Sequence, residues 1–532
     1  MYEKAKNNPH LDPDMALDTE KDAWQHKDDA STTPNLKMRD GIILMPQPSD
    51  DPTDPLNWSW LRKHAAMFTI SYLALICYVA VTTLVTGTVP VAKSLGVSKS
   101  TAVYLGNTPV ALYGVAPWLW SPLSHFLGRR PVLLACNAIA MVGAVVVATS
   151  QTYAACIVGR VILGAGGSAF WTLGPASIGD MFFLHEKGKK IGISTLAIVV
   201  SPFLGTIIGG PIIEDPNLGW RASQWIPLVC MGAGFIMQVF FLPETIYIRE
   251  AANTNSSVTE IKKPTLWARY GIHIPKRREE NNHSFFFIAT RPIILCKYPA
   301  VMLSAFWFGI AYMMHVGITA EIPLVFEADY NFSVLDVGLT GFSGLIGALV
   351  GEAYAGPALD FIVKHTMKQG REWQPEYRLQ AIWPALITVP GGLIMFGASL
   401  QFGNAWITPL VGQAVYIFGI EIATTVVYGQ HPIPLVTKDQ RANYETGSQT
   451  YILECYPRQG AEANLVFNLI RNIFSYTAPF FLQPMIAKMG MTSTFGLFAA
   501  LTVFFFPFTI GILIWRGKEI RDKGGDPGWS RG

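Results

Sequence analysis

Ser121-Pro-Leu-Ser-His-Phe-Leu-Gly-Arg-Arg130 is a short polar stretch between two long apolar ones, residues 101–121 and 131–149. A helix needs about 20 apolar residues to cross a bilayer, and both flanking stretches approach that length. Lysine and arginine favour the cytosolic ends of membrane helices, so the closing Arg-Arg pair indicates a cytosolic loop. The stretch therefore predicts a hairpin of two membrane-spanning helices joined on the cytosolic side.

The same alternation continues in both directions along the 532 residues. Apolar runs of spanning length lie near 65–90, 101–121, 131–149, 153–178, 191–213 and 224–243, and again near 299–326, 335–362, 380–401, 405–427, 463–486 and 493–515. Only 14% of the residues are charged, against roughly 25% in an average soluble domain. We predict an all-α membrane protein with twelve transmembrane helices in two six-helix bundles.

Composition and charge divide the rest of the chain. The predicted parts are a disordered cytosolic tail at 1–60, an N-terminal bundle at 61–243, a cytosolic linker at 244–297, a C-terminal bundle at 298–515 and a cytosolic tail at 516–532. With both termini inside, most of the loop lysines and arginines fall on the cytosolic side. This sidedness supports an even number of spans. The sequon Asn331-Phe-Ser333 then falls in an outer loop and is a candidate glycosylation site.

A polar segment at 427–449 interrupts the pattern directly after the tenth span. It is longer than the roughly 12–15 residues above which loops are uncommon. Two interpretations stay open. The segment is a cytosolic insertion, or it is a retained intron, since Val427-Tyr428, Ala442-Asn443 and Gln449 can be encoded by donor, branch and acceptor signals in one frame.

Several classes of function are disfavoured. The net charge is only +3, and the basic residues do not form one patch, so nucleic-acid binding is not expected. The six cysteines show no CxxC or metal-ligand spacing. There is no phosphate-binding loop of the ATP-driven pumps. We therefore expect no cofactor, no metal and no enzymatic activity, and a protein that is monomeric.

The loop quoted first resembles the signature of the major facilitator superfamily, which has Gly, then Asp, then Gly-Arg-Arg. Gly128, Arg129 and Arg130 match, whereas Ser121 and His125 replace the first Gly and the Asp. In that family the loop is a conformational latch, so the resemblance implies a latch altered at His125. Gly356-Pro-Ala-Leu-Asp360, in the corresponding loop after the eighth span, keeps both the Gly and the Asp and looks like an internal repeat.

Two further motifs lie inside predicted spans. Arg160 in the fourth span matches an intramembrane arginine that the family associates with proton movement; the alternative is that its side chain reaches the outer surface. Ser201-Pro-Phe-Leu-Gly-Thr-Ile-Ile-Gly-Gly210 resembles a signature of the exporting branches, matched at Pro202, Gly205, Gly209 and Gly210. Simple helix packing is the other explanation of these small residues.

Four ionisable side chains inside the second six spans are candidates for proton coupling or substrate binding: His315, Glu321, Glu352 and Glu421. Such residues are costly in a membrane and are commonly functional. Each also has a structural alternative, which for His315 is an interhelical hydrogen bond and for Glu321 a position near the outer surface. Aromatic residues such as Trp171 and Tyr312 are candidates for lining a cavity for flat organic molecules, or else for packing.

Fragments such as Asp51-Pro-Thr-Asp-Pro-Leu-Asn-Trp58 and Leu242-Pro-Glu-Thr245 look like fungal members of the drug:proton antiporter branch. The resemblance implies proton-coupled export of small organic molecules, by alternating access, across a plasma membrane. The alternative is an uptake symporter for a polyamine-like cation, because Gly179–Gly188 is similar to a polyamine-moving subgroup. A sensor or membrane enzyme is a third, disfavoured reading.

Overall fold

The computed structural model describes residues 37–39, 42–247, 285–369, 374–427, 451–456 and 459–525. Most of the predicted N-terminal tail, residues 248–284 of the predicted linker and residues 428–449 of the predicted insertion lie outside this described part. Two compact units divide the chain at Asp50. In the first, β1 (Met38–Arg39) pairs antiparallel with β2 (Ile42–Ile43), in the register that sets Met38 opposite Ile43.

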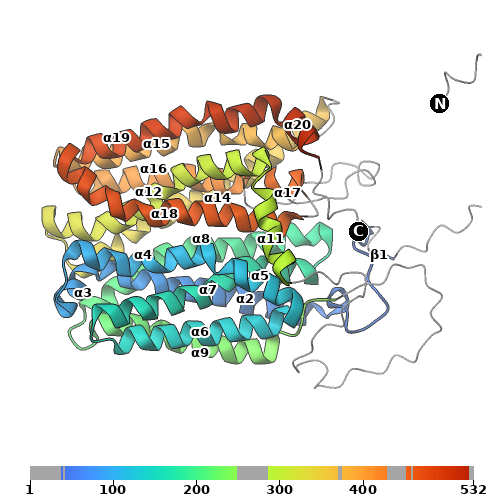
Figure 1. The fold of residues 1–532 in the computed structure, drawn as a ribbon, viewed down its shortest axis with the longest axis horizontal. Helices are drawn as coiled ribbons and strands as arrows, with labels where there is room; N and C mark the ends of the chain where they lie inside the picture. The colour runs from blue at the N-terminus through green and yellow to red at the C-terminus, as the bar shows by residue number, and fades with distance from the viewer. Residues whose placement is uncertain are drawn as a thin grey trace, which may run out of the picture. The chain divides into compact units, whose positions relative to one another are not determined.

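The second unit, from Asp51 onward, is helical (Figure 1). Its first set of helices is η1 (Pro55–Asn57), α2 (Trp60–Thr86), α3 (Thr88–Leu95), α4 (Lys99–Val115), α5 (Pro117–Leu127), α6 (Arg129–Thr149), α7 (Tyr153–Met181), α8 (Leu184–Glu214) and α9 (Gly219–Phe241). The second set is α11 (Phe285–Leu295), α12 (Pro299–Asp329), α13 (Val334–Leu339), α14 (Gly341–Lys368), η3 (Pro375–Ile382), α15 (Trp383–Gln401), α16 (Ile407–Val427), α17 (Tyr451–Cys455), α18 (Gly460–Met489), α19 (Met491–Phe505), η5 (Pro507–Gly511) and α20 (Ile512–Gly524).

In the described part of the chain, 11 helical segments are long and apolar enough to cross a membrane. The predicted second span is divided between α4 and α5, which meet at Ala116. Pro117 has no N–H with which to continue the hydrogen bonding of α4, so this proline accounts for the break. With α4 and α5 taken together, the twelve spans predicted from the sequence are confirmed.

The helix contacts repeat between the two halves with an offset of six spans. In the first half, α2 packs on α8, α6 on α7, α4 on α7, and α6 on α9. The equivalent pairs in the second half, α12 with α18, α15 with α16, α14 with α16, and α15 with α19, are also in contact. The two six-helix bundles are therefore pseudo-symmetric, as inverted or parallel repeats in membrane proteins commonly are.

The halves meet through α4 against α18 and through α8 against α13 and α14. We call the end of the bundle that carries residues 87–98, 215–218 and 330–333 the far end; α3 marks it in Figure 1, and α20 marks the opposite, near end. Three contacts join the halves at the far end. Lys99 Nζ lies 3.8 Å from Glu327 Oε1, the rings of Tyr104 and Phe480 stack 4.7 Å apart, and Val334 N–H donates to Glu214 Oε2 at 3.0 Å.

Part of the predicted linker is an apolar helix. α11 contacts α5 of the first half and α18 of the second. The Phe285 ring lies 5.8 Å from that of Phe126 on α5, and Arg291 Nη1 lies 3.8 Å from Glu462 Oε1 on α18. This helix therefore connects the two halves at the near end.

Candidate functional site

A cavity between the two halves is the strongest candidate for a binding site. It encloses about 600 Å³ of empty space, counted out to its open side, and is lined by residues of α7, α8, α12, α16 and α18. Its polar lining residues are Thr195, Tyr312, His315, Glu421, Thr424 and Arg471. We call it the central cavity. Ligand pockets commonly show this mixture of apolar walls with a few polar groups.

Arg471 on α18 is the cation of the central cavity, and the sequence analysis did not single it out. Its guanidinium carbon lies 5.0 Å from the ring centroid of Tyr312 and 5.5 Å from that of Trp171, so it contacts aromatic faces from both halves. Trp171 in turn packs against Tyr78 and Tyr113, at 4.5 and 5.1 Å between centroids. The overlooked signal was a single arginine inside the eleventh apolar run.

Glu421 on α16 lines the same cavity, and Glu352 on α14 lies within electrostatic range of it. Thr425, one turn after Glu421, donates a hydrogen bond from Oγ1 to Glu352 Oε2 at 2.9 Å. The two helices come close here because Gly351 has no Cβ; one built there would lie 2.8 Å from the Glu421 Cβ. The structure thus brings together two of the predicted acids as neighbouring carboxylates.

His315 lines the central cavity from α12 and is 6% exposed. Its ring makes an edge contact with Phe203 of α8 at 5.8 Å and a tilted contact with Tyr312 at 5.0 Å. Nδ1 of His315 is buried and has no hydrogen-bond partner in the described part of the chain. The imidazole therefore keeps hydrogen-bonding capacity that a ligand or water in the cavity can use.

Glu321 stands apart from this group. Its carboxylate accepts a hydrogen bond from Gln483 Nε2 of α18, and the residue is 2% exposed. It is absent from the lining of the central cavity. Both partners belong to the second half, so this is an interhelical hydrogen bond within that half, whereas the structural alternative predicted for Glu321 was a position near the outer surface.

Arg160 is also fully buried, in the core of the first half. Its Nε donates to the Leu105 carbonyl at 2.7 Å, and its Nη2 donates to that of Val81 at 2.6 Å. Pro109, four residues after Leu105, has no N–H, so the Leu105 oxygen lacks its usual helical donor. Arg160 supplies that donor and ties α7 to α2 and α4. The alternative that its side chain reaches the outer surface is wrong, because the residue is 0% exposed.

The first latch motif surrounds the start of α6. The Glu244 carboxylate, which follows α9, accepts the backbone N–H groups of Arg129 at 3.0 Å and Arg130 at 3.1 Å. Anions are favoured at this position because helix N-termini carry free N–H groups and a positive dipole end. Gly128 has φ of 96°, and a Cβ there would lie 2.5 Å from Glu244 Oε2. The sequence motif Leu242-Pro-Glu-Thr245 gives no sign of this role of Glu244.

The side chains of the motif face the near end. Arg129 Nη2 lies 3.0 Å from Asp180 Oδ2 at the end of α7, and Arg130 Nη2 donates to the Val239 carbonyl at 3.0 Å. His125 lies in the last turn of α5 and lines a small pocket together with Arg129 and Asp180.

The second latch motif was predicted to be a loop, but in the structure it is helical. Gly356 and Asp360 lie within α14, which continues to Lys368, and not in a loop. No glycine or proline follows Pro357 before the end of this helix, so nothing in the sequence interrupts it there. At the same end, Arg521 Nη1 of α20 lies 2.9 Å from the buried Glu376 Oε1.

The exporter-type motif on α8 faces two directions. A Cβ on Gly209 would lie 2.5 Å from the Thr83 carbonyl oxygen, and one on Gly205 would also meet α2, at the Thr82 hydroxyl. Gly210 instead faces Gly338 of α13, where a Cβ would lie 3.0 Å from the Gly338 Cα. Pro202 contributes to the wall of the central cavity. The motif thus serves packing inside the first half and contact between the halves.

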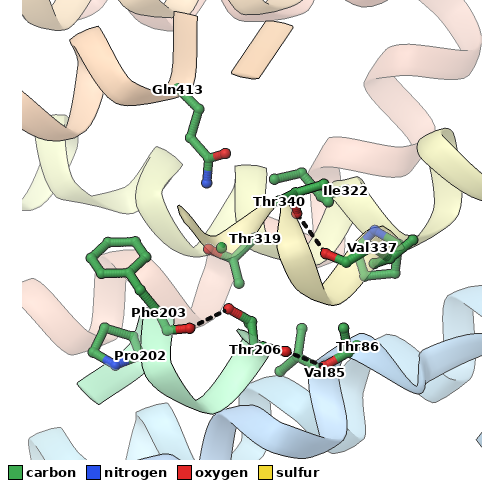
Figure 2. Close-up of a pocket in the computed structure, with 12 residues that line it drawn as sticks. Val85, Thr86, Pro202, Phe203, Thr206, Thr319, Ile322, Val337, Thr340 and Gln413 are labelled. Atoms are coloured by element: carbon green, nitrogen blue, oxygen red, sulfur yellow. Dashed lines mark hydrogen bonds between the residues drawn. The ribbon is translucent and has the colours of Figure 1, made fainter. Parts of the chain in front are cut away.

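A second cavity, the far cavity, lies beside the central one toward the far end; its empty space is about 390 Å³ when counted out to its open side. Figure 2 shows Phe203 and Thr206 on α8 and Gln413 reaching in from the other half. Pro202 and Phe203 line both cavities. With His315 against it, the Phe203 ring stands between the two spaces.

A family model described as Major Facilitator Superfamily matches residues 71–436. The chain belongs to the Major Facilitator Superfamily. It is therefore a transporter that carries a small molecule across a membrane, and not an enzyme.

Two fungal proteins are similar to this facilitator in sequence. The cycloheximide resistance protein of Candida maltosa is 25% identical over 410 residues, which cover 74% of this chain and 72% of that protein. The MFS-type transporter penM of Penicillium rubens is 26% identical over 432 residues, covering 79% and 80%. The crystal structure of the human organic anion transporter MFSD10 has the same fold, with a TM-score of 0.53 at 16% identity over 84% of this chain and 99% of that one.

Proposed function

We propose that this facilitator exports small organic molecules in exchange for protons, by alternating access. The observation that carries the proposal is the central cavity, where Glu421 and Arg471 of the second half face Trp171 of the first. A cavity built by both halves changes its exposure when the halves rock. The fungal relatives support the exporting direction, because one of them is named for resistance to cycloheximide.

Glu421 is the residue that we assign to proton exchange, with Glu352 as its neighbour. A carboxylate beside a second carboxylate and a cation is suited to take up and release one proton. When Glu421 is ionised, its charge balances Arg471, and the aromatic walls are free for a flat substrate. When Glu421 takes up a proton, this balance changes and the substrate is released. His315 and Tyr312 supply hydrogen bonds that orient the substrate.

The proposal places both termini in the cytosol and the protein in the plasma membrane, as a monomer. The distribution of lysine and arginine supports this orientation. The far end is then extracellular. Asn331 lies at this end and is exposed, so it remains a proposed glycosylation site. With the halves joined at the far end, the structure corresponds to the state closed to the outside.

Transport in proteoliposomes tests the proposal. An imposed proton gradient should drive cycloheximide, or a related lipophilic drug, in the direction opposite to the protons. A potential of 100 mV supplies about 2.3 kcal/mol per charge, equivalent to roughly a 40-fold concentration ratio. Movement of spermidine in the same direction as the protons would instead establish the uptake symporter.

Glu421→Gln should abolish drug transport driven by the proton gradient, whereas substrate exchange measured with equal pH on both sides should remain. Glu321→Gln is the matched control, because this buried acid lies on the same half but outside the central cavity. Full gradient-driven transport by Glu421→Gln would remove Glu421 from the coupling mechanism. Loss of coupling in both variants would show that lining the central cavity is not what distinguishes the proton-coupling acid from other buried acids.

A further inference from the structure

A third space lies on the outside of the second half, opposite the far cavity. This lateral groove encloses about 1210 Å³ and is formed by α13, α14, α15 and α16. Its walls are almost entirely apolar, and Phe342, Ile346 and Val411 are 47%, 58% and 44% exposed. In a membrane protein, exposed apolar side chains of spanning helices face lipid acyl chains. The lateral groove is therefore open to the bilayer.

A hydrogen bond joins a residue of the lateral groove to a residue of the far cavity. Ser343 of α14 lines the groove, Gln413 of α16 lines the far cavity, and Ser343 Oγ donates to Gln413 Oε1 at 2.6 Å. Figure 2 shows the Gln413 amide pointing into the far cavity. One turn further along α14, Gly347 packs directly against the backbone of Ala414, which closes the passage on that side.

The Ser343–Gln413 bond can open without leaving the serine unsatisfied. Ser343 Oγ also lies 2.8 Å from the Thr340 carbonyl of its own helix, and a hydroxyl has one hydrogen to donate. Rotation of that hydrogen toward Thr340 keeps the serine bonded and releases Gln413. Interhelical hydrogen bonds in membranes are individually weak, so breaking this one costs little free energy.

We propose that the gap between α14 and α16 at Ser343 and Gln413 is a lateral portal, through which an uncharged lipophilic molecule passes between the bilayer and the far cavity. The groove selects the class of molecule, because a charged group entering it would leave water without gaining a partner. In combination with the proposed function, on which this part rests, the portal makes bilayer-dissolved compounds the substrate class.

The test is reaction of a cysteine placed in the far cavity. Thr319→Cys on α12 lines that cavity, and Cys230→Ser with Cys296→Ser removes the native cysteines that are not buried. In proteoliposomes, the labelling rate is measured with N-pyrenylmaleimide, which partitions into the bilayer, and with a charged methanethiosulfonate, which does not.

Gln413→Ala should raise the rate with the lipophilic reagent at least threefold and leave the charged reagent unchanged. Val411→Trp, which fills the lipid-facing groove from an exposed position, should lower the lipophilic rate at least threefold, again without affecting the charged one. Unchanged lipophilic rates in both variants, or parallel changes with both reagents, would overturn the portal.

The labelling experiment needs no gradient and no transport. A portal response in a protein that fails to exchange drug for protons would overturn the proposed function and leave the portal intact. Normal proton-driven export, together with labelling rates that neither variant changes, would overturn the portal and leave the proposed function intact.

Discussion

Pro109 and Pro202 each leave one carbonyl oxygen inside a membrane helix without its usual amide partner, and a side chain supplies the missing donor in both cases. Arg160 donates to Leu105, four residues before Pro109, and Ser201 Oγ donates to Ile198, four residues before Pro202, at 2.6 Å. Unpaired backbone groups are costly in a membrane interior. Ser201 of the exporter-type motif thus supplies a donor to the carbonyl that the adjacent proline leaves without one.

Arg160→Lys should lower stability, because an ammonium cannot reach the carbonyls of α2 and α4 together as the planar guanidinium does. We expect a loss on the order of 1–3 kcal/mol, since buried carbonyls become unsatisfied. Thermal unfolding in detergent, followed by tryptophan fluorescence, measures it.

Pro109→Ala provides the control, because an alanine at 109 restores an N–H for the Leu105 carbonyl. The double variant should be more stable than the sum of the two single effects predicts, by about 0.5–1.5 kcal/mol. Strict additivity would show that the proline and the arginine act independently.

The sequence identified Arg160 and Glu421 because charged residues stand out within apolar runs. The residues that these two side chains contact could not be predicted from the sequence. Arg160 bonds to backbone carbonyls that no residue type marks, and Glu421 meets Arg471 only when the tenth and eleventh spans are folded together. Glu321 and Glu421 were both coupling candidates in the sequence, and the packing shows that Glu421 lines the central cavity and Glu321 does not.

At the scale of the helix, α8 serves two interfaces with glycines in adjacent positions. Gly209 meets α2 within the first half, and Gly210 meets Gly338 of α13 across the halves. The interface between α8 and α2 lies within the first half and stays in contact throughout transport. The interface between α8 and α13 has to separate if the far end opens during transport. Substitutions at these interfaces should therefore have different consequences.

Gly338→Ala should shift the protein toward the state open at the far end, because its Cβ would lie 2.7 Å from the Gly210 Cα. Labelling of Thr319→Cys by an impermeant reagent from that side should rise severalfold. Gly209→Ala is the comparison. Its Cβ would meet the Thr83 carbonyl at 2.5 Å, so it should lower the melting temperature and leave labelling unchanged. Equal labelling rates in the two variants would contradict the assignment of different roles to the two glycine interfaces.

At the scale of the whole molecule, twelve spans and two halves follow from apolar runs and charge sidedness, which depend on length and composition alone. The joining of the halves does not. It depends on which residues of α4, α8, α13 and α18 face one another, and on cavities that form only between bundles. The same contacts that hold the far end closed are the ones that alternating access has to break.

The pair of Lys99 and Glu327 offers a direct test of that movement. Both side chains are partly exposed, at 51% and 33%, and exposed ion pairs contribute only about 0–1 kcal/mol. Lys99→Ala should therefore change transport less than twofold. Joining the positions covalently should have a much larger effect. In Lys99→Cys with Glu327→Cys, a flexible thiol cross-linker should stop drug export, and a reducing agent should restore it, as measured in the same proteoliposomes. Each single cysteine variant, treated alike, should keep its activity; continued export by the cross-linked protein would mean that the far end does not open in the transport cycle.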